Sequence, residues 1–427
     1  MSSATGLRQL TIGMAVYGDI TFDSRVRREA ATLVAAGHVV TLVCLDDAPG
    51  ATDLISGVTV YVHRPDASAV LPRSASPFLG PVSGRVGGAL RRVRWLRDYI
   101  ANLRAWGRWT AERFADQVDV WHLHDLPALV AIGPRIRRQT PIVYDSHELF
   151  LETGTARRLP RPLRAMLKAE ERRLARQAFA VVTVNDSLAD VLERQYQPRR
   201  IVVAHNCPDR SPLPDAPSGT IRHATGILEG EPIIVYHGNL TAHRGIEQLM
   251  QAILRPGLER THLVLIGFGQ GRDAYRQAAA DPSLGGRVHV LPPVAPHELQ
   301  AWITSADVEG MPIQASTLNH YLSTPNKLFE ALAAGVPVVA SDFPAMRAIV
   351  MDEVRGPLGA VCEPADVPAL ASALRSILDL DPAATQALRT RCLAAARDRW
   401  NWQVESVGLL SLYAEIASPA FDVVYRK

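Results

Sequence analysis

The sequence has 427 residues, more than one hydrophobic core usually supports, so we expect at least two domains. Hydrophobic residues make up 47% and charged residues 21%, a composition typical of an α/β enzyme, and the net charge of +3 is too small to indicate nucleic-acid binding. The four cysteines lie far apart and form no C-x-x-C pair, which argues against a cysteine metal site or a disulfide framework.

The sequence shows no pattern of an export signal or a membrane span. Residues 1–9 lack the apolar stretch of a signal peptide, and no run approaches the roughly 18 apolar residues that a span needs. We therefore expect a cytoplasmic protein, and peripheral contact with the inner face of the membrane stays open.

Short β-branched runs alternate with amphipathic segments along the whole chain. In the first half the expected strands are "LTIGMAVYG", "HVVTLVCLD", "VTVYVHRP", "VDVWHLHD", "TPIVYDSHE" and "FAVVTVND". In the second half they are "PIIVYHGN", "THLVLIGFG", "RVHVLPP", "ADVEGMPI", "VPVVASD" and "LGAVCEP". This alternation predicts parallel sheets covered by helices, with right-handed crossovers.

A stretch with four prolines separates the two halves, and we interpret it as a linker. The predicted parts are an N-terminal Rossmann-like domain at 1–206, the linker at 207–219, a C-terminal Rossmann-like domain at 220–400 and a last helix at 401–427 that returns to the first domain. Ligands of such sheets bind beyond the carboxyl ends of the strands. Two edges of this kind facing one another would form a cleft for two substrates.

Polar residues collect at the expected strand ends. In the first domain they are Gly18, Asp19, His122, His124, Asp125, Asp145, His147 and Glu148. In the second domain they are Gly238, Asn239, Gly267, Phe268, Gly269 and the segment Thr324–Glu330.

The segment "STPNKLFEALAAG" predicts a short helix with a charged start. Pro325 suits the first turn of a helix, and Lys327 and Glu330 share one face. A helix start favours phosphate, lysine adds a full charge, and glutamate can accept hydrogen bonds from a ribose diol. The segment therefore indicates a sugar nucleotide, and a surface ion pair worth about 0.3 kcal/mol is the alternative.

Two glycine-containing strand ends indicate a similar ligand. In "VYHGNLTAHRGIEQLM", Gly238 lets the chain pass close to a ligand and Arg244 can hold a diphosphate, although a solvated loop arginine fits the pattern equally well. "LVLIGFGQGRDAY" departs from the dinucleotide fingerprint, because Arg272 replaces the third glycine and the next strand lacks the ribose-binding acid. We expect no nicotinamide cofactor, while a glycine turn against a nucleotide base stays open.

Two histidines of one strand raise the question of a metal. His122 and His124 predict either a zinc site completed by a distant residue such as His147 or a polar active-site wall, which we favour. No nucleophile elbow is present, and the sole D-x-D, Asp379 to Asp381, has the position of a solvated turn. A metal-dependent transferase with a single Rossmann domain is therefore disfavoured.

Residues 85–113 form a strongly basic segment, with eight arginines against two acids and apolar residues at helical spacing. The pattern predicts either a helix that contacts anionic lipid or a helix that packs its apolar stripe on the sheet and shows arginine to solvent. "ARRLPRPLRAMLKAEERRLARQ" is similar. We expect no nucleic-acid partner, because no known reader motif accompanies the charge.

Taken together, the motifs resemble those of retaining glycosyltransferases of family 4, which have the GT-B fold. The resemblance covers nearly the whole chain and rests on "GDITFDSRVRREAATLVAAGH", "HLHDLPAL", "IVYDSHELF", "HGNLTAHRGIEQL", "LIGFG" and "NKLFEALAAGVPVVASD", in this order. It implies an α/β protein with two Rossmann-like domains whose parallel sheets face across a cleft. The N-terminal domain would bind the acceptor and the C-terminal domain the nucleotide sugar. The "P-N-K-L-F-E" signature is that of a subgroup.

The resemblance also implies roles for single residues. Glu330 matches the family's ribose-binding glutamate, whereas the glutamate expected to contact the donor sugar would fall at Leu322. The family's phosphate-binding arginine and lysine correspond to Asn239 and Arg244, and Lys327 would restore the missing charge.

The expected site follows from these matches. Catalytic roles are expected for His124, Asp19, Arg244 and Lys327. Donor binding is expected for Gly18, Gly238, Asn239, Arg244, Gly267, Phe268, Val294, Pro325, Asn326, Lys327, Leu328 and Glu330. The acceptor side would hold Asp23, Arg25, His147 and Glu148. No metal and no cofactor beyond the sugar nucleotide are expected.

The implied activity is transfer of a sugar from a UDP- or GDP-sugar with retention of configuration and without an enzyme nucleophile. The acceptor would be a lipid-linked glycan or a small metabolite such as an alcohol, aminocyclitol or thiol. Two alternatives stay open: a GT-B sugar-nucleotide epimerase and a non-catalytic sugar-nucleotide-binding protein. The sequence does not decide between a monomer and a homodimer.

Overall fold

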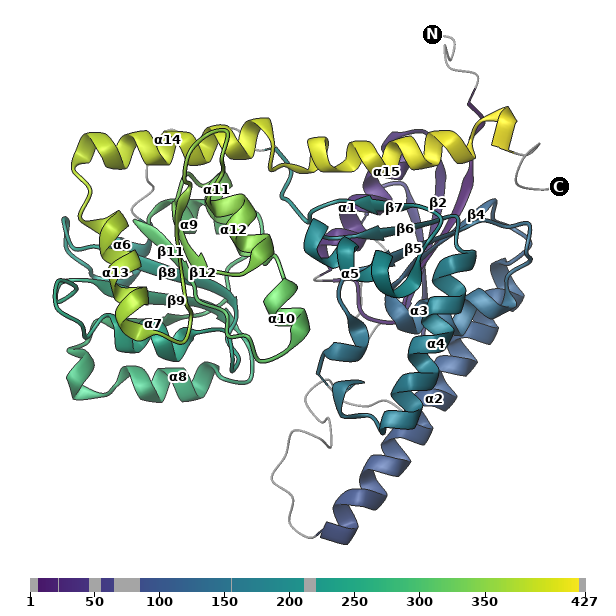
Figure 1. Ribbon diagram of the computed structural model, residues 1–427, viewed down its shortest axis with the longest axis horizontal. Coiled ribbons are helices and arrows are strands. Elements are labelled where there is room, and N and C mark those ends of the chain that lie inside the picture. Colours follow the sequence, from purple (N-terminus) through teal and green to yellow (C-terminus); the bar gives the residue numbers. More distant parts are fainter. Residues whose placement is uncertain are drawn as a thin grey trace. The chain divides into compact units, whose positions relative to one another are not determined.

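The computed structural model describes residues 7–21, 23–45, 55–64, 85–154, 156–210 and 220–421. The chain divides into two compact units: unit 1 comprises residues 1–206 and 406–427, and unit 2 comprises residues 207–405. Each unit is built on a parallel sheet packed with helices (Figure 1), which confirms the predicted α/β class.

Unit 1 contains a seven-stranded sheet of order β3-β2-β1-β4-β5-β6-β7, in which neighbouring strands are parallel. Its strands are β1 Thr11–Val16, β2 Val39–Leu45, β3 Val58–His63, β4 Val120–His124, β5 Ile142–Ser146, β6 Ala180–Thr183 and β7 Ile201–Val203. Its helices include α1 Ser24–Ala35, α2 Arg85–Phe114, α3 Asp125–Ile132, α4 Arg161–Gln177 and α5 Asp186–Tyr196. The short edge strand β7 was not predicted, because three residues give too little pattern.

Unit 2 contains a six-stranded sheet of order β10-β9-β8-β11-β12-β13, also with parallel neighbours. Its strands are β8 Ile233–Asn239, β9 His262–Phe268, β10 Val288–Leu291, β11 Val308–Met311, β12 Val338–Ser341 and β13 Gly359–Cys362. Its helices are α6 Thr220–Thr225, α7 Ile246–Ala252, α8 Arg272–Ala279, α9 Leu299–Thr304, α10 Leu318–Leu322, α11 Asn326–Ala333, α12 Pro344–Val350, α13 Val367–Leu378 and α14 Pro382–Asp398. Helices pack against its sheet and form two apolar cores with it, one that includes α11 and α14 and one that includes α7 and α13.

The last helix, α15 (Trp402–Ile416), begins in unit 2, and its residues from Ser406 onwards belong to unit 1. Leu409, Leu412 and Ile416 have no exposed surface, so this helix contributes to the core of unit 1. Its Tyr413 reaches the buried histidines described below.

The basic helix α2 packs along only part of its length. Trp106 and Phe114, near its C-terminal end, are buried, whereas Val93 is 67% exposed. The helix extends away from the sheet towards its N-terminal end (Figure 1). Among the side chains described at 93–114, the predicted apolar stripe therefore contacts the core from Tyr99, whose ring lies 5.7 Å from that of Tyr17, to Phe114. Among the described residues, no helix is long and apolar enough to cross a membrane.

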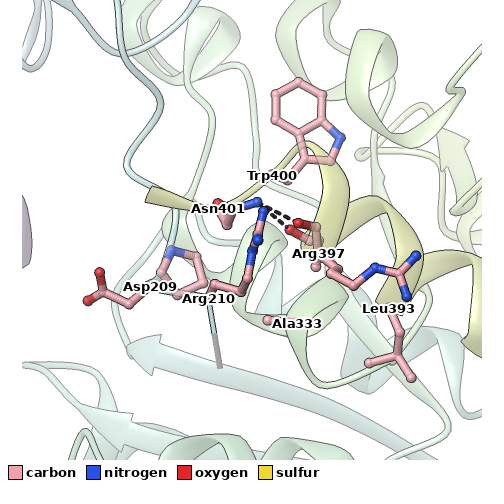
Figure 2. Close-up of a pocket in the computed structure, with 9 residues that line it drawn as sticks. Asp209, Arg210, Ala333, Leu393, Arg397, Trp400 and Asn401 are labelled. Carbon is pink, nitrogen blue, oxygen red and sulfur yellow. Dashed lines mark hydrogen bonds between the residues drawn. The ribbon is translucent and has the colours of Figure 1, made fainter. Parts of the chain in front are cut away.

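A small pocket lies in unit 2 where α14 ends (Figure 2). Asn401 lines it and donates its side-chain amide to the carbonyl oxygens of Ala396 and Arg397, each at 2.9 Å. The space is about 20 Å³, enough for about one water molecule and far too small for a nucleotide.

Candidate functional site

The carboxyl ends of β8 and β9 lie side by side at one edge of the unit 2 sheet. Gly238 and Gly267 are register partners there, with φ angles of 108° and 157°. A Cβ on Gly267 would lie 1.9 Å from the carbonyl oxygen of Gly238, so a side chain does not fit. A Cβ on Gly238 would lie 3.8 Å from Lys327 Nζ, so the missing side chain leaves space beside this amine.

Lys327 lies in the first turn of α11, and its amine is turned towards the sheet. Nζ is 3.2 Å from the centroid of the Tyr236 ring on β8 and is buried without a hydrogen-bond partner among the described residues. Burial lowers the pKa of Lys327 to about 7; Glu309 opposes this shift and Arg244 adds to it. The alternative of a solvent-exposed ion pair is therefore wrong. A buried ammonium that lacks an acceptor is unfavourable, so it is suited to an incoming anion.

Glu330, one turn further along α11, contacts a second titratable group. Its Oε2 lies 2.8 Å from His237 Nε2, and His237 Nδ1 lies 3.0 Å from Oε2 of Glu309 on β11. Burial alone would lower the pKa of His237, but the two carboxylates raise it to about 9. His237 is therefore an imidazolium at neutral pH, placed between two carboxylates.

The structure brings Arg244 to the same edge. It lies in the loop before α7 and is half-buried, and its charge contributes to the low pKa of Lys327. The next residue, Gly245, has a φ of 82°, and a Cβ there would lie 2.0 Å from the carbonyl oxygen of Pro312. The loop is thus fixed tightly against the chain after β11.

Other residues predicted to bind the donor lie in the same unit as Lys327, Glu330 and Arg244. Asn239 is exposed at the end of β8, Phe268 at the end of β9 is 52% exposed, and Val294 is partly buried after β10. Pro325 is the N-cap of α11, Asn326 is its exposed first residue and Leu328 is buried in the core. Leu322, where the family has a glutamate, ends α10 with 7% exposure.

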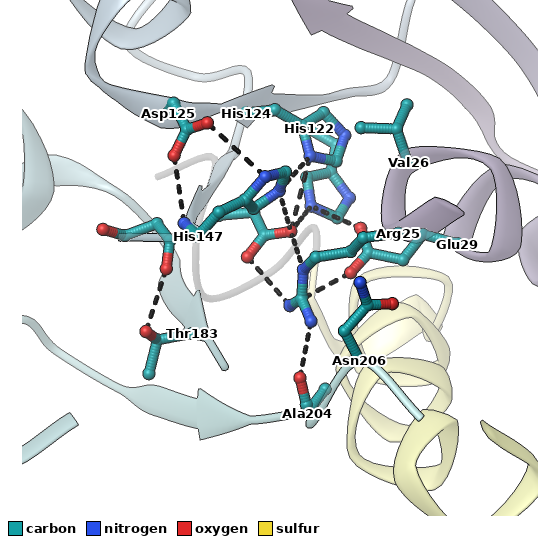
Figure 3. A network of polar contacts seen from close by, with 12 residues as sticks. Arg25, Val26, Glu29, His122, His124, Asp125, His147, Thr183, Ala204 and Asn206 are labelled. Carbon is teal, nitrogen blue, oxygen red and sulfur yellow. Dashed lines mark hydrogen bonds and ion pairs between the residues drawn. The ribbon is translucent and has the colours of Figure 1, made fainter. Parts of the chain in front are cut away.

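Unit 1 places a network of buried charges at the carboxyl ends of β4 and β5 (Figure 3). Arg25 on α1 is 2% exposed and donates to both carboxylate oxygens of Asp145, at 2.8 and 2.9 Å. It also donates to the Ala204 carbonyl at 2.5 Å and lies 3.1 Å from Glu29 Oε1. Burial would raise the pKa of Asp145, but the attraction of Arg25 and His147 holds it well below its usual value.

Three histidines complete this network. His122 and His124 are fully buried and stacked, with ring centroids 4.5 Å apart, whereas His147 keeps 17% of its side chain exposed. His147 lies 3.1 Å from Asp145 Oδ2 and 3.4 Å from Asp125 Oδ2. Burial would lower the pKa of His147, but these carboxylates raise it to about 10. Burial lowers the pKa of His124 to about 3, so its ring is neutral.

The network has the spacing of a metal site but a donor set that suits ion pairs. Four buried residues offer ligand atoms within 4.8 Å of one another: Glu29, His122, His124 and Asp145. Both oxygens of Asp145 already accept from Arg25, and His122 Nδ1 lies 3.0 Å from the Tyr413 hydroxyl of α15. A dication here would be repelled by the buried guanidinium. We therefore keep the interpretation as a polar wall rather than a zinc site.

The predicted residues of this edge differ in accessibility. The guanidinium of Arg25 is 2% exposed and donates to Asp145 and to the Ala204 carbonyl inside unit 1. Asp23 caps α1, with Oδ1 accepting from the Val26 amide at 3.1 Å. His124 lies 3.1 Å from His147 and has no exposed surface, so among the three described histidines of this network only His147 is partly exposed.

The remaining predicted residues of unit 1 lie in loops at the same edge. Gly18 and Asp19 follow β1, and Asp19 Oδ1 accepts from the Thr21 amide at 2.7 Å. Glu148 follows β5, and its carbonyl oxygen accepts from the Ser146 hydroxyl at 3.1 Å.

Tyr236, His237 and Glu309 were not predicted from the sequence. One signal was present: Glu309 is the sole charged residue of "VEGMPI", and a carboxylate in a buried strand needs a partner. The identity of that partner depends on β11 lying beside β8, which strand patterns alone do not give.

Two family models match the chain. The one described as "Glycosyltransferase Family 4" matches residues 24–211, and the one described as "Glycosyl transferases group 1" matches residues 231–380. Both descriptions agree with the resemblance noted in the sequence.

Similar proteins are known from several bacteria. A glycogen synthase of Mycobacterium tuberculosis is 30% identical over 308 residues, covering 69% of this chain and 68% of the relative. A D-inositol 3-phosphate glycosyltransferase of Geodermatophilus obscurus is 27% identical over 391 residues, covering 83% of each chain.

Solved structures share the fold. A sucrose-phosphate synthase from Thermosynechococcus elongatus has a TM-score of 0.71 at 20% identity, covering 96% of this chain and 99% of the other. Anabaena Alr3699/HepE in complex with UDP has a TM-score of 0.67 at 16% identity, covering 94% and 98%. These likenesses confirm the GT-B fold as two Rossmann-like, parallel-sheet units.

Proposed function

Since this chain belongs to the glycosyltransferases that the family 4 and group 1 models describe, we propose that it transfers a sugar from a UDP- or GDP-sugar, with retention of configuration and without a metal ion. The observation that carries the proposal is the buried amine of Lys327, which lacks a hydrogen-bond partner among the described residues and lies one helical turn from the partly exposed Glu330. Such an amine suits a diphosphate, and the carboxylate suits a ribose diol.

In this proposal the donor diphosphate lies over the start of α11. Lys327 and Arg244 stabilise the charge that develops on the leaving phosphate, and Glu330 holds the ribose. The bond between the sugar C1 and the diphosphate breaks while the acceptor atom bonds to C1 from the same face. The acceptor proton passes to the departing phosphate oxygen, so no enzyme nucleophile is needed.

Unit 1 supplies the acceptor side of the proposed reaction. His147 is a partly exposed imidazolium of its edge, and Asp125 beside it has a pKa raised to about 7 by burial. These groups can orient hydroxyl groups of an acceptor. The names of the relatives, a glycogen synthase and a D-inositol 3-phosphate glycosyltransferase, support an acceptor rich in hydroxyls, either a glycan or a small metabolite.

The test is product analysis with UDP- and GDP-hexoses in the presence of EDTA, with a panel of lipid-linked glycans and small polyols, amines and thiols. We expect one donor and acceptor pair to give a glycoside with the anomeric configuration of the donor. A changed sugar nucleotide formed without acceptor would indicate an epimerase instead. Donor binding without turnover across the panel would indicate a non-catalytic binding protein.

We further propose that unit 1 contacts an anionic membrane through α2. Arg94, Arg97, Arg104 and Arg108 are exposed and recur at helical spacing, and Arg94 and Arg97 are 78% and 73% exposed. Charge reversal at Arg104 and Arg108 should reduce co-sedimentation with vesicles containing phosphatidylglycerol. Charge reversal at the exposed Arg375 of unit 2 should leave the co-sedimentation with these vesicles unchanged. Equal binding of all variants would contradict this contact.

A further inference from the structure

A histidine that the proposed mechanism does not use connects two carboxylates beneath the proposed donor site. His237 is 3% exposed, and its two ring nitrogens lie 3.0 Å from Glu309 and 2.8 Å from Glu330. A neutral imidazole can donate from only one nitrogen, so two carboxylate partners favour the doubly protonated ring. This arrangement forms a chain of carboxylate, imidazolium and carboxylate.

One end of the chain is fixed inside the sheet. Glu309 has no exposed surface, and its register partner on β8 is Val235, two residues before His237 and therefore on the same face as His237. A buried carboxylate is tolerated only when it is paired, so Glu309 and His237 hold each other in place. Both belong to strands, which are the most rigid elements available to support a site.

The other end of the chain reaches the ligand side. Glu330 exposes 27% of its side chain and belongs to α11, the helix that also carries Lys327. A glutamate on a helix surface would sample several rotamers, and its ion pair with the fixed imidazolium selects one. In the part of the chain that the structure describes, the other titratable or charged side chains near this group include Lys327 on α11, Arg244 before α7, Glu247 on α7 and Tyr236 on β8.

We propose that His237 is a positioning residue for Glu330: anchored on Glu309, its imidazolium holds the Glu330 carboxylate in the orientation that accepts the ribose hydroxyls of the donor nucleotide. The inference rests on the proposed function, because it assumes that Glu330 meets the ribose. It extends that function, because ribose recognition would depend on the second ring proton of His237.

The charge of the imidazolium is essential to this role. Without the proton, two carboxylates would remain close together with only a neutral ring between them, and Coulomb repulsion would favour rotation of the exposed one. Since Glu309 is enclosed by the sheet, Glu330 is the group that moves. Loss of the proton should therefore weaken ribose recognition and leave phosphate binding to Lys327 and Arg244.

The experiment compares nucleotides that differ only in the ribose. Calorimetry measures the affinities of UDP, GDP and their 2′,3′-dideoxy forms for the wild type, for His237→Leu and for Glu330→Ala. Hydrogen bonds to a charged group predict about tenfold tighter binding of the ribonucleotide by the wild type. We expect this ratio to fall to about twofold or less in both variants.

A control and a second variant protect the test against folding effects. His237→Leu leaves Glu309 without its partner, so the double variant His237→Leu/Glu309→Met replaces the pair by apolar side chains that can fold. His262→Gln is the matched control, because His262 begins β9, at the opposite end of the strand from the site, and also lies near a glutamate, 3.3 Å from Glu231. The double variant should lose the ribose ratio, and the control should keep it.

The pH dependence gives a further readout that a purely structural role would not change. In the wild type the ribose ratio should hold below pH 9 and fall as the pH rises through about 9, where His237 loses its proton. In the double variant the ratio should not change over this range.

Each outcome has a distinct meaning. A double variant that binds both nucleotides more weakly but keeps the tenfold ratio would overturn the positioning role. A wild type without any ribose ratio, but with tight nucleotide binding, would show that Glu330 does not meet the ribose and would overturn that part of the proposed function as well. Absence of nucleotide binding would overturn both.

Discussion

Both units carry buried charges at the carboxyl edge of a parallel sheet, but the charges are balanced in different ways. In unit 1, Arg25 donates to both oxygens of Asp145 and has 2% exposure. In unit 2, the amine of Lys327 is buried over an aromatic ring with no hydrogen-bond partner among the described residues. A charge that the chain pairs by itself stabilises the fold, whereas a charge left without an acceptor is available for a ligand.

The largest expected effect is on the stability of unit 1. Arg25→Met leaves Asp145 buried without its main partner, which should destabilise unit 1 by about 3–5 kcal/mol. Because a protein of two units need not unfold in one step, the measurement is hydrogen exchange resolved to β4 and β5. Arg94→Met, at an exposed arginine of the same unit, is the control and should change stability by less than about 0.5 kcal/mol. Equal effects of both variants would remove the contrast between the units.

The second prediction concerns the opposite behaviour of Lys327. Lys327→Met keeps an unbranched chain against the Tyr236 ring and removes an unpaired charge, so unit 2 should not lose stability. The affinity for the nucleoside diphosphate should fall by about 2 kcal/mol, roughly thirtyfold, because a charge-assisted hydrogen bond is lost. Calorimetry and thermal unfolding of the same samples measure both quantities. A destabilised variant with unchanged affinity would make the amine a structural group.

The next-largest effect is expected for donor binding by Arg244. This residue is half-buried near Lys327 and has several donors for a diphosphate. We expect Arg244→Ala to weaken donor binding or kcat/KM at least tenfold, about 1.4 kcal/mol. Arg272→Ala, on α8, is a control that should keep the wild-type values. Wild-type kinetics for Arg244→Ala would move the phosphate away from this loop.

The smallest predicted effect is a dependence on pH. The pKa of Lys327 is lowered to about 7 in the free protein, and a bound diphosphate favours the charged amine. At pH values well below 7 the amine already carries its proton, so the affinity should be constant there, and at pH 7 it should have fallen about twofold. Between pH 7 and pH 8 the free protein must take up this proton, so the affinity should fall about fivefold. Calorimetry in two buffers of different ionisation enthalpy should show uptake of nearly one proton at pH 8, and none for Lys327→Met.

Much of the fold could be predicted because it rests on local pattern. All twelve β-branched runs singled out in the sequence contain a strand, since a buried parallel strand needs a continuous apolar run whatever its neighbours are. The strand β7 was missed for the same reason, because three residues are too few to form a recognisable apolar run.

The site was predictable only where residues lie close together in the chain. Lys327 and Glu330 share a helix, so their common face followed from spacing. The partners that determine their chemistry come from elsewhere: Tyr236 under the amine and His237 beside the carboxylate. Arg25 shows the same limit, because its partner Asp145 is 120 residues away and only the sheet order brings them together.

The proposed donor site at the start of α11 is tested most directly by a metal-free titration of the wild type and Glu330→Ala with UDP and with GDP. We expect the wild type to bind one of the two nucleotides in EDTA and the affinity to fall at least tenfold in Glu330→Ala, about 1.4 kcal/mol. Affinity that is the same in both proteins, or no binding of either nucleotide by the wild type, would contradict the proposed donor site.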